Sequence, residues 1–296
     1  MPSLPPPDAR ALSRDHPAYP EGFRDLGNAP AIAYVHGADL PKPARAVAIV
    51  GARAASPYGR AMAERLAFDL ARLGLVVVSG LARGIDAAAH RGALEAGGAT
   101  VAVLPSGLDR ITPRHHQELA ERIVGRGALV SELASGPPRF RGEFVRRNRL
   151  IAAMAAATVV VEATERSGAL STADVARALG RAVLAVPGDV GRETARGCHR
   201  LLRDGAALCE HAGDVLRAVE RWNAANDATP REAKHQVAGP PEARLLAALA
   251  DTPRSIETLA HVAALDIPEA MAGLLALEWA GSARALPGQR WVRTPS

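Results

Sequence analysis

Between Ala46 and about residue 186, short apolar runs alternate with longer segments whose apolar residues recur at helical spacing. The apolar runs occupy residues 47–50, 75–79, 100–104, 128–131, 158–162 and 182–186, and the helical patterns cover residues 59–73, 85–96, 115–124, 145–156 and 171–179. Strands that are apolar throughout are buried on both faces, as in a parallel sheet covered by helices. We therefore expect an α/β fold with a Rossmann-like, doubly wound, mostly parallel sheet, whose sites lie at the C-terminal ends of the strands.

The two ends of the chain differ from this middle part in composition and in the periodicity of their apolar residues. Residues 1–43 are rich in proline and short of apolar periodicity, which predicts an N-terminal arm with little core of its own. We expect the Rossmann-like domain at 44–222 and a polar linker at 223–240. Residues 241–296 show three short helical patterns and a ribbon with a Pro-Gly turn, the order of elements in a winged helix.

Composition narrows the compartment and the partner only weakly. The net charge is +5 and the sequence pI is near 9.8, which favours a polyanionic partner. Cys198 and Cys209 are too few for a disulfide framework and suit two free thiols in a reducing cytoplasm. The first residues do not resemble a signal peptide, and no segment is long and apolar enough to span a bilayer, so we expect no membrane association.

A cluster of arginines precedes the apolar segment 150–157. Residues 139–149 hold five arginines, one glutamate and two phenylalanines at the expected start of a helix. The helix dipole already makes that end positive, so arginines there favour a bound anion, with phosphate the first choice. Phe144, inside the cluster, could stack on a base, whereas we expect Phe140 in the core.

The first strand-to-helix turn argues against a dinucleotide. A pyrophosphate-binding loop needs glycine where this sequence has Arg53 and Ser56. A guanidinium at this place favours direct pairing with phosphate, and the alternative is a solvated arginine on a loop.

Later turns repeat polar residues just beyond a strand. Arg83 lies between Gly80 and Gly84, and Ser-Gly pairs follow at residues 106–107 and 167–168. Asp86 is placed to cap the helix of the second turn and to pair with His90 four residues later. Because the turns leave the same edge of a parallel sheet, we expect them to line one shallow basic groove together with the arginine cluster.

No catalytic or cofactor motif is evident. The histidines lack zinc spacing, no acidic cluster suggests magnesium, and neither a nucleophile elbow nor a Walker A loop is present. Glu132 and Glu162 lie at strand ends, where a carboxylate could act as acid or base or could neutralise neighbouring arginines. We predict no catalytic residue, no metal and no cofactor.

Five motifs in this order resemble the bacterial DNA-processing protein A family (DprA, also called Smf). They are VAIVGAR at 47–53, SGLARGIDAAAH at 79–90, FVRRNR at 144–149, SGALSTA at 167–173 and AVPG at 185–188. The similarity runs over about residues 19–206, and the tail resembles the winged-helix domain that some members carry. Val145 replaces the family's usual proline, and the family's helical N-terminal domain looks truncated to residues 1–43.

The resemblance implies an extended Rossmann domain that binds single-stranded DNA, forms homodimers, and protects incoming strands and loads RecA onto them during natural transformation. It implies no enzymatic activity. Its motifs place the DNA groove at Arg53, Arg83, Ser106, Gly107, Arg141, Phe144, Arg146, Arg147, Asn148, Arg149, Ser167 and Gly168.

Two alternatives stay open. One is a Rossmann-type nucleotide phosphoribohydrolase, although the loop at 167–172 lacks the following glutamate of those enzymes. The other is a winged-helix regulator of duplex DNA, although its third helix, near 268–278, carries no lysine or arginine for a major groove.

Overall fold

The computed structural model describes residues 6–138, 140, 142–227, 240–250, 253–263, 265–287 and 290–294. The chain divides into two compact units. The first comprises Met1–Asp25 and Pro30–Ala225, and the second comprises Leu26–Ala29 and Asn226–Ser296.

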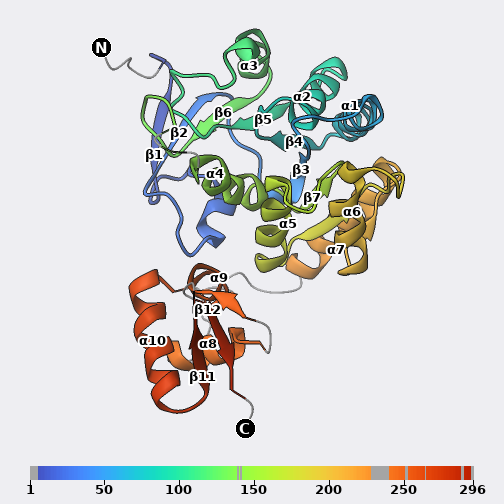
Figure 1. Ribbon diagram of the computed structural model, residues 1–296. Helices are drawn as coiled ribbons and strands as arrows, with labels where there is room; N and C mark the ends of the chain where they lie inside the picture. The colour runs from blue at the N-terminus through green and yellow to red at the C-terminus, as the bar shows by residue number, and fades with distance from the viewer. Residues whose placement is uncertain are drawn as a thin grey trace. The chain divides into compact units, whose positions relative to one another are not determined.

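A mixed sheet, nine-stranded in the described part of the chain, organises the first unit (Figure 1). Its order is β1-β2-β6-β5-β4-β3-β7-β8-β9, and all pairs from β6 to β9 are parallel. The parallel strands are β3 (Ala46–Val50), β4 (Val76–Ser79), β5 (Thr100–Val103), β6 (Ala128–Ser131), β7 (Ala157–Val160), β8 (Ala182–Ala185) and β9 (Ala207–Leu208). Successive strands step outward from β3 to β6 and then restart at β7 on the other side of β3. The expected doubly wound sheet is confirmed, and its topological switch point lies between β3 and β7.

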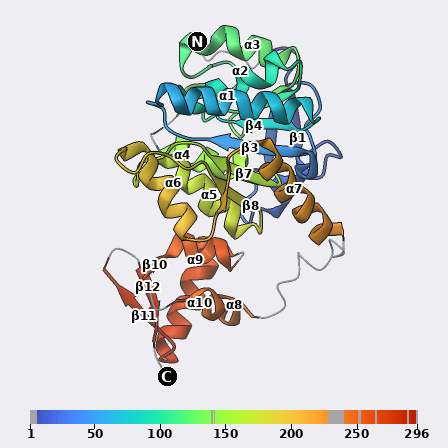
Figure 2. The same ribbon diagram turned by 90° about the vertical axis from the view of Figure 1, so that its right-hand side faces the viewer.

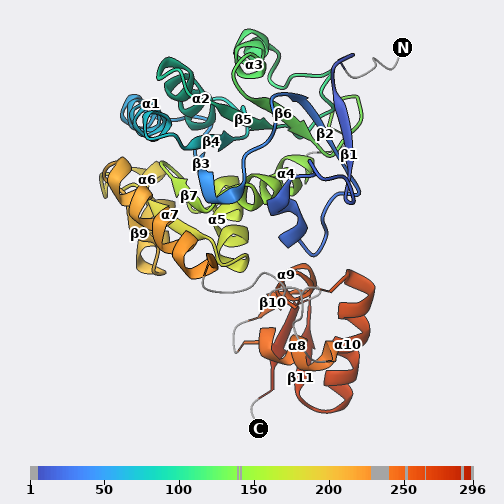
Figure 3. The ribbon, with the colours of Figure 1, turned by 180° about the vertical axis from the view of Figure 1, so that it is seen from behind.

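Helices cover both faces of this sheet (Figure 2). One face carries α1 (Pro57–Arg72), α2 (Ile85–Glu95) and α3 (Gln117–Val124), and the other carries α4 (Gly142–Ala153) and α5 (Gly168–Ala178). Leu66 and Leu70 of α1 pack against Val47 and Ile49 of β3 in the main core. Two further helices follow, α6 (Glu193–Arg203) and α7 (Ala212–Asp227), and α7 lies beside the β7–β8 end of the sheet (Figure 3).

Local signals explain where α1 begins and ends. Ser56 is its N-cap, with the hydroxyl accepting a hydrogen bond from the backbone N–H of Gly59 at 3.0 Å, and Pro57 occupies the first helical position. Gly74 follows the helix with φ of 78°, a conformation that glycine adopts without strain. Both ends of this helix are therefore set by residues of the local sequence.

The N-terminal segment is part of the fold, so the prediction of an arm with little core was wrong. Strands β1 (Arg10–Ser13) and β2 (Ile32–Gly37) extend the sheet, and β2 pairs antiparallel with β6. The short helix η1 (Glu21–Asp25) buries Phe23 completely. Strand β1 is the edge strand and β2 lies between it and β6. Both strands are short and partly exposed, and their brief alternation is hard to recognise between prolines.

The second unit contains three helices and a small antiparallel sheet in the described residues. Its elements are α8 (Pro241–Ala248), β10 (Arg254–Ser255), α9 (Ile256–Val262), α10 (Ile267–Trp279), β11 (Ala283–Leu286) and β12 (Arg290–Arg293), with strand order β10-β12-β11. Leu245, Leu259, Leu274 and Trp291 form its core. The expected winged helix is confirmed. Of the predicted linker, residues 223–227 belong to α7 and residues 228–239 lie outside the described residues.

Two further short helices, η2 (Pro43–Arg45) and η3 (Arg114–His116), precede β3 and α3.

Because strands β3 to β8 are parallel, the loops that follow them all leave the same edge of the sheet.

Candidate nucleic-acid interface

A cleft with a volume of ≈ 300 Å³ lies at the switch point of the sheet. The loops after β3, β4 and β7 and the first turns of α4 and α5 line it, and we call it the switch-point cleft. Six of the predicted site residues meet in it: Arg53, Phe144, Arg147, Asn148, Ser167 and Gly168. Open α/β sheets bind ligands at this place because the loops diverge there.

Arg53 and Phe144 form the accessible rim of the cleft. The guanidinium carbon of Arg53 lies 4.8 Å from the centre of the Phe144 ring, a cation–π contact. Arg53 is exposed, and its side chain forms no hydrogen bond or ion pair with another described residue, while Phe144 is half-buried. The pair therefore presents unused N–H donors next to an aromatic edge.

The first turn of α5 supplies an anion-attracting end. Ser167 caps this helix through a hydrogen bond accepted from the Ala169 N–H at 3.3 Å, and the next residue, Gly168, is exposed. Asn148 donates to the Gly168 carbonyl and to the Ser171 hydroxyl, both at 3.0 Å. Asn148 thereby ties α4 to the helix N-terminus whose dipole favours a negative group.

Arg147 forms the floor of the cleft and is only 4% exposed. Its Nη1 donates to the carbonyl of Gly80 at 2.7 Å and to that of Val103, so it joins α4 to the ends of β4 and β5. A side chain at position 80 would collide with it, since a Cβ there would lie 2.5 Å from Nη2. Burial lowers the pKa of Arg147 to about 10, although Asp86 opposes the shift. Arg147 thus holds two loops in place.

Asp86 is the buried counterpart of Arg147. It is 6% exposed and accepts a hydrogen bond from the Ala82 N–H at 3.3 Å. Burial raises its pKa, and Arg147 opposes this rise. Asp86 does not cap α2, because Gly84 occupies the N-cap position of that helix and no side chain caps it. His90 does not pair with Asp86 either: its Nδ1 lies 2.7 Å from the Thr100 hydroxyl. The predicted cap and i,i+4 pair were wrong.

Arg149 and Arg146 both pair with Glu132. Arg149 is 6% exposed and donates from Nη2 to Glu132 Oε2 at 2.5 Å, whereas half-exposed Arg146 reaches the same oxygen at 3.3 Å. Burial lowers the pKa of Arg149. Of the two roles left open for Glu132, the structure shows the neutralising partner.

Two predicted contact residues are inaccessible. Ser106 is fully buried, with its hydroxyl donating to the Arg110 carbonyl at 2.5 Å, and Gly107 is buried with its N–H bonded to the Gly136 carbonyl at 2.9 Å. They shape the loop after β5 and cannot touch a ligand in this conformation, because the polypeptide covers them.

The remaining predicted residues lie at or beyond the rim. Arg83 is exposed but does not line the cleft. Arg139 and Arg141 lie outside the described residues. Phe140, expected in the core, is 58% exposed, so that prediction was wrong.

A carboxylate already occupies the N-terminus of α1. The Glu162 side chain accepts hydrogen bonds from the Ser56 N–H at 2.9 Å and from the Ser56 hydroxyl at 2.5 Å. Gly59 makes room for it, since a Cβ there would lie 2.4 Å from the Glu162 carboxyl carbon. A pyrophosphate bound at the first turn of a dinucleotide fold would need this position. The geometry thus gives a physical reason why the glycine fingerprint is absent, and this role of Glu162 had no sequence signal beyond its place at a strand end.

The described part of the chain contains neither a metal-binding cluster nor a helix that could span a membrane. No group of three or more His, Cys, Asp or Glu residues there is arranged to hold a metal ion. No helix among those residues combines the length and apolarity needed to cross a bilayer.

Comparisons with known proteins give a consistent family. The model for DNA recombination-mediator protein A matches residues 10–220, and that for the DprA winged helix domain matches residues 228–289. Protein Smf of Escherichia coli is 36% identical over 289 residues, which cover 95% of this chain and 77% of that protein. A DprA relative from Mycobacterium tuberculosis is 50% identical over 198 residues, and the match spans 66% of this chain but only about half, 51%, of the relative's length.

Solved structures agree. DNA processing protein A from Streptococcus pneumoniae superimposes with a TM-score of 0.66 at 36% identity, covering 71% of this chain and 74% of that one. DNA processing protein A from Helicobacter pylori, described for its single-stranded DNA binding mode, gives a TM-score of 0.65 at 28% identity, covering 75% of this chain and 99% of that one. The chain belongs to the DNA recombination-mediator protein A family, the DNA-processing proteins also called DprA or Smf.

Proposed function

We propose that this protein binds single-stranded DNA in the switch-point cleft. The observation that carries the proposal is exposed Arg53 lying over Phe144 beside the first turn of α5. Phosphates would pair with Arg53 and with the helix N-terminus, while a base would stack on Phe144. The relative from Helicobacter pylori, described for its single-stranded DNA binding mode, supports the same ligand.

The proposal divides the predicted residues by accessibility. Arg53, Phe144, Asn148, Ser167 and Gly168 are assigned to direct contact, because they line the cleft and are exposed or half-buried. The exposed Arg83 and Arg146 attract the strand at longer range. The buried Arg147, Arg149, Ser106 and Gly107 hold the loops that shape the cleft.

Arg53→Ala tests the proposal, with Arg72→Ala as the matched control. Arg72 also lies over an aromatic ring, 6.0 Å from the centre of Phe68, but at the other end of α1 and thus at the opposite edge of the sheet. Affinity for a labelled oligonucleotide is measured by fluorescence anisotropy over a series of salt concentrations. Losing one phosphate contact on a single strand decreases the magnitude of the negative slope of log K against log salt by roughly 0.7. We expect this decrease for Arg53→Ala and the wild-type slope for Arg72→Ala.

Three results would contradict the proposal. One is a wild-type slope in a folded Arg53→Ala variant, and another is an equal decrease in both variants. The third is a wild-type affinity for duplex DNA equal to that for the single strand, because a cleft with an aromatic edge favours unstacked bases.

We also propose that the protein acts in the cytoplasm as a homodimer that protects incoming single strands and loads RecA onto them, without enzymatic activity of its own. Membership of the family supports these roles. The test is the rate of RecA filament growth on single-stranded DNA covered by single-strand binding protein. We expect the wild type to raise this rate and Arg53→Ala to raise it less at a subsaturating protein concentration. An unchanged rate with the wild type would contradict the loading role.

Neither alternative function gains an observation. The loop at 167–172 forms the capped start of α5, where Ser171 donates to the Gly168 carbonyl, and no glutamate follows it in that helix. Helix α10, the third helix of the second unit, carries Glu269 and Glu278 but no lysine or arginine. Its exposed Trp279 suits an apolar contact better than a DNA groove.

A further inference from the structure

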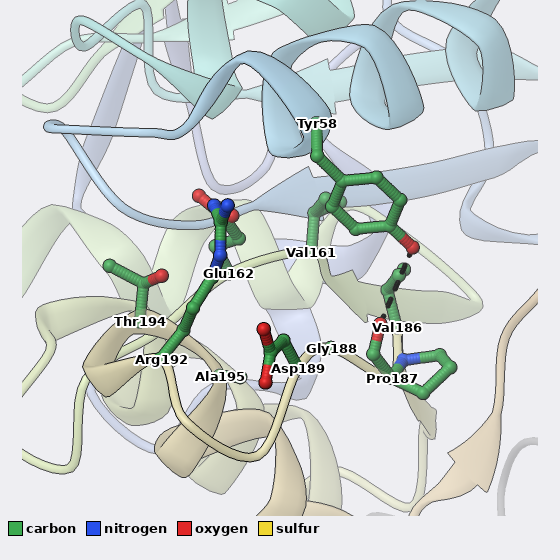
Figure 4. Close-up of a pocket in the computed structure, with 10 residues that line it drawn as sticks. All are labelled: Tyr58, Val161, Glu162, Val186, Pro187, Gly188, Asp189, Arg192, Thr194 and Ala195. Atoms are coloured by element: carbon green, nitrogen blue, oxygen red, sulfur yellow. Dashed lines mark hydrogen bonds between the residues drawn. The ribbon is translucent and has the colours of Figure 1, made fainter.

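A second cavity, with a volume of ≈ 420 Å³, lies against Glu162 and shares no lining residue with the switch-point cleft. Tyr58 of α1, the end of β7 and the loop between β8 and α6 line it, and we call it the Tyr58 pocket (Figure 4). Its walls include Tyr58, Glu162, Pro187, Asp189 and Arg192, whose side chains surround a common space. None of these residues has a role in the function proposed above.

The pocket combines a flat aromatic wall with hydrogen-bond acceptors. Tyr58 is 47% exposed although its hydroxyl donates to the Pro187 carbonyl at 3.4 Å, so part of the ring remains open. Val186 and Pro187 provide an apolar surface at the same end. One oxygen of Asp189 accepts from the Gly191 N–H at 2.8 Å, and the other has no partner among the described residues.

The charges of the pocket select against phosphate. Two carboxylates, Glu162 and Asp189, face a single cation, Arg192. A phosphate would be repelled by the carboxylates, whereas a planar uncharged ring with N–H donors would stack on Tyr58 and donate to Asp189. Unpaired bases supply such donors: adenine, cytosine and guanine through an exocyclic amino group, and thymine through its ring N3–H.

The position of the pocket connects it to the switch-point cleft. Glu162, which lines the pocket, accepts hydrogen bonds from Ser56, and Ser56 lies in the segment between Arg53 of the cleft and Tyr58 of the pocket. Arg53 and Tyr58 lie five residues apart on one loop and helix start, so their Cα atoms are at most about 18 Å apart. A strand with a phosphate on Arg53 can therefore place a base in the Tyr58 pocket within a few nucleotides.

We infer that the Tyr58 pocket receives one unstacked nucleobase of the single strand held in the switch-point cleft. This inference rests on the proposed function, because the strand must first be bound at Arg53. The pocket then fixes the strand by stacking of the base on Tyr58 and by an N–H group of the base donating to Asp189.

The experiment combines variants of Tyr58 with an oligonucleotide scanned by single abasic sites. Tyr58→Leu removes the ring but keeps an apolar side chain, and Tyr58→Phe keeps the ring as the matched control. Base stacking on an aromatic side chain contributes about 1–3 kcal/mol, so we expect Tyr58→Leu to weaken binding roughly 5- to 150-fold and Tyr58→Phe to leave the affinity near that of the wild type. We expect an abasic site at one position of the oligonucleotide to weaken binding to the wild type about as much as Tyr58→Leu does. The same abasic site should weaken binding to Tyr58→Leu little further, since both changes remove the same contact.

The outcomes separate this inference from the proposed function. If the wild type binds no single strand, the proposed function fails. If the wild type binds and Arg53→Ala weakens binding, but Tyr58→Leu matches the wild type, only the pocket inference is overturned. Additive losses at every abasic position would overturn it too. The inference is also overturned if free deoxyadenosine binds saturably while no abasic position shows a reduced effect in Tyr58→Leu. That result would assign the pocket to a free nucleoside.

Discussion

Arg147→Ala is expected to reduce folding stability by more than any exposed arginine of the same helix. In the wild type the buried guanidinium bonds to the carbonyls of Gly80 and Val103 and faces buried Asp86. The loop that it holds includes Leu81, which is fully buried with φ of 56°, an unfavourable conformation for a non-glycine residue. Removing the guanidinium therefore releases a strained loop.

The magnitude follows from these contacts. A hydrogen bond from a charged donor contributes about 1.5–3 kcal/mol, and removing one partner of a buried ionic pair costs about 3–5 kcal/mol. Both values include the loss of the same charged hydrogen bonds, so they are not added. We expect a decrease of about 3–5 kcal/mol in the free energy of unfolding. Arg146→Ala is the control on the same helix. Its side chain is 49% exposed, and surface pairs of this kind contribute about 0–1 kcal/mol.

Cysteine reactivity measures this stability for the first unit alone. Cys198 and Cys209 are both buried there, so a short pulse of a thiol reagent at increasing urea concentration reports the unfolded fraction of that unit. A midpoint for Arg147→Ala within the error of that for Arg146→Ala would refute the reasoning. So would a stable Arg147→Ala variant that had lost only DNA affinity, because Arg147 would then be a ligand rather than a support.

The deficit of Arg147→Ala should also depend on pH. The pKa of Asp86 is raised in the folded state, so the stability that this group contributes is complete below its unfolded pKa and is lost as the pH rises through the folded value. Arg147 limits the rise, and its removal extends the loss to higher pH. We expect the difference in unfolding free energy between wild type and variant to shrink on acidification toward pH 4. A difference that grew on acidification would contradict the pairing of Asp86 with Arg147.

Three further predictions follow from buried groups. Gly59→Ala places a Cβ 2.4 Å from the Glu162 carboxyl carbon and should destabilise the protein by about 1–3 kcal/mol in urea unfolding; a neutral effect would mean that Glu162 moves freely. Burial raises the thiol pKa of Cys198 and of Cys209 to about 12, so both should react with a thiol reagent at pH 8 far more slowly than in urea, and fast native reaction would contradict their burial. Burial lowers the pKa of His90 to about 3, so its ring proton shifts should stay constant in NMR spectra from pH 8 to about pH 5; a midpoint near pH 6.5 would contradict this.

Local periodicity was sufficient to predict the main sheet and the edge of that sheet at which the candidate site lies. Val47 to Val50 and the other apolar runs predict buried parallel strands, and the order of strands and helices then places every following loop at one edge. The same logic missed β1 and β2, because Ala33 and Val35 alternate with exposed residues over too short a stretch.

Because the arginines of residues 146–149 are close together in the sequence, we expected them to form one basic surface. In the tertiary structure their side chains point to different partners. Helix α4 links β6 to β7 across the sheet, which turns Arg147 toward the carbonyls at the ends of β4 and β5 and Arg149 toward Glu132. These partners lie between 17 and 67 residues away in sequence, so no local pattern could identify them.

The sequence by itself determined the fold class, the winged helix, the family and the edge of the sheet that carries the candidate site, because these depend on local periodicity and on motifs of a few residues. Only the tertiary structure decided which polar side chains are accessible there. Arg53 remains exposed over Phe144, whereas Arg147 and Ser106 are buried by segments distant in sequence. Burial is a property of the packed chain, and it separates a residue that can bind a ligand from one that supports the loop beside it.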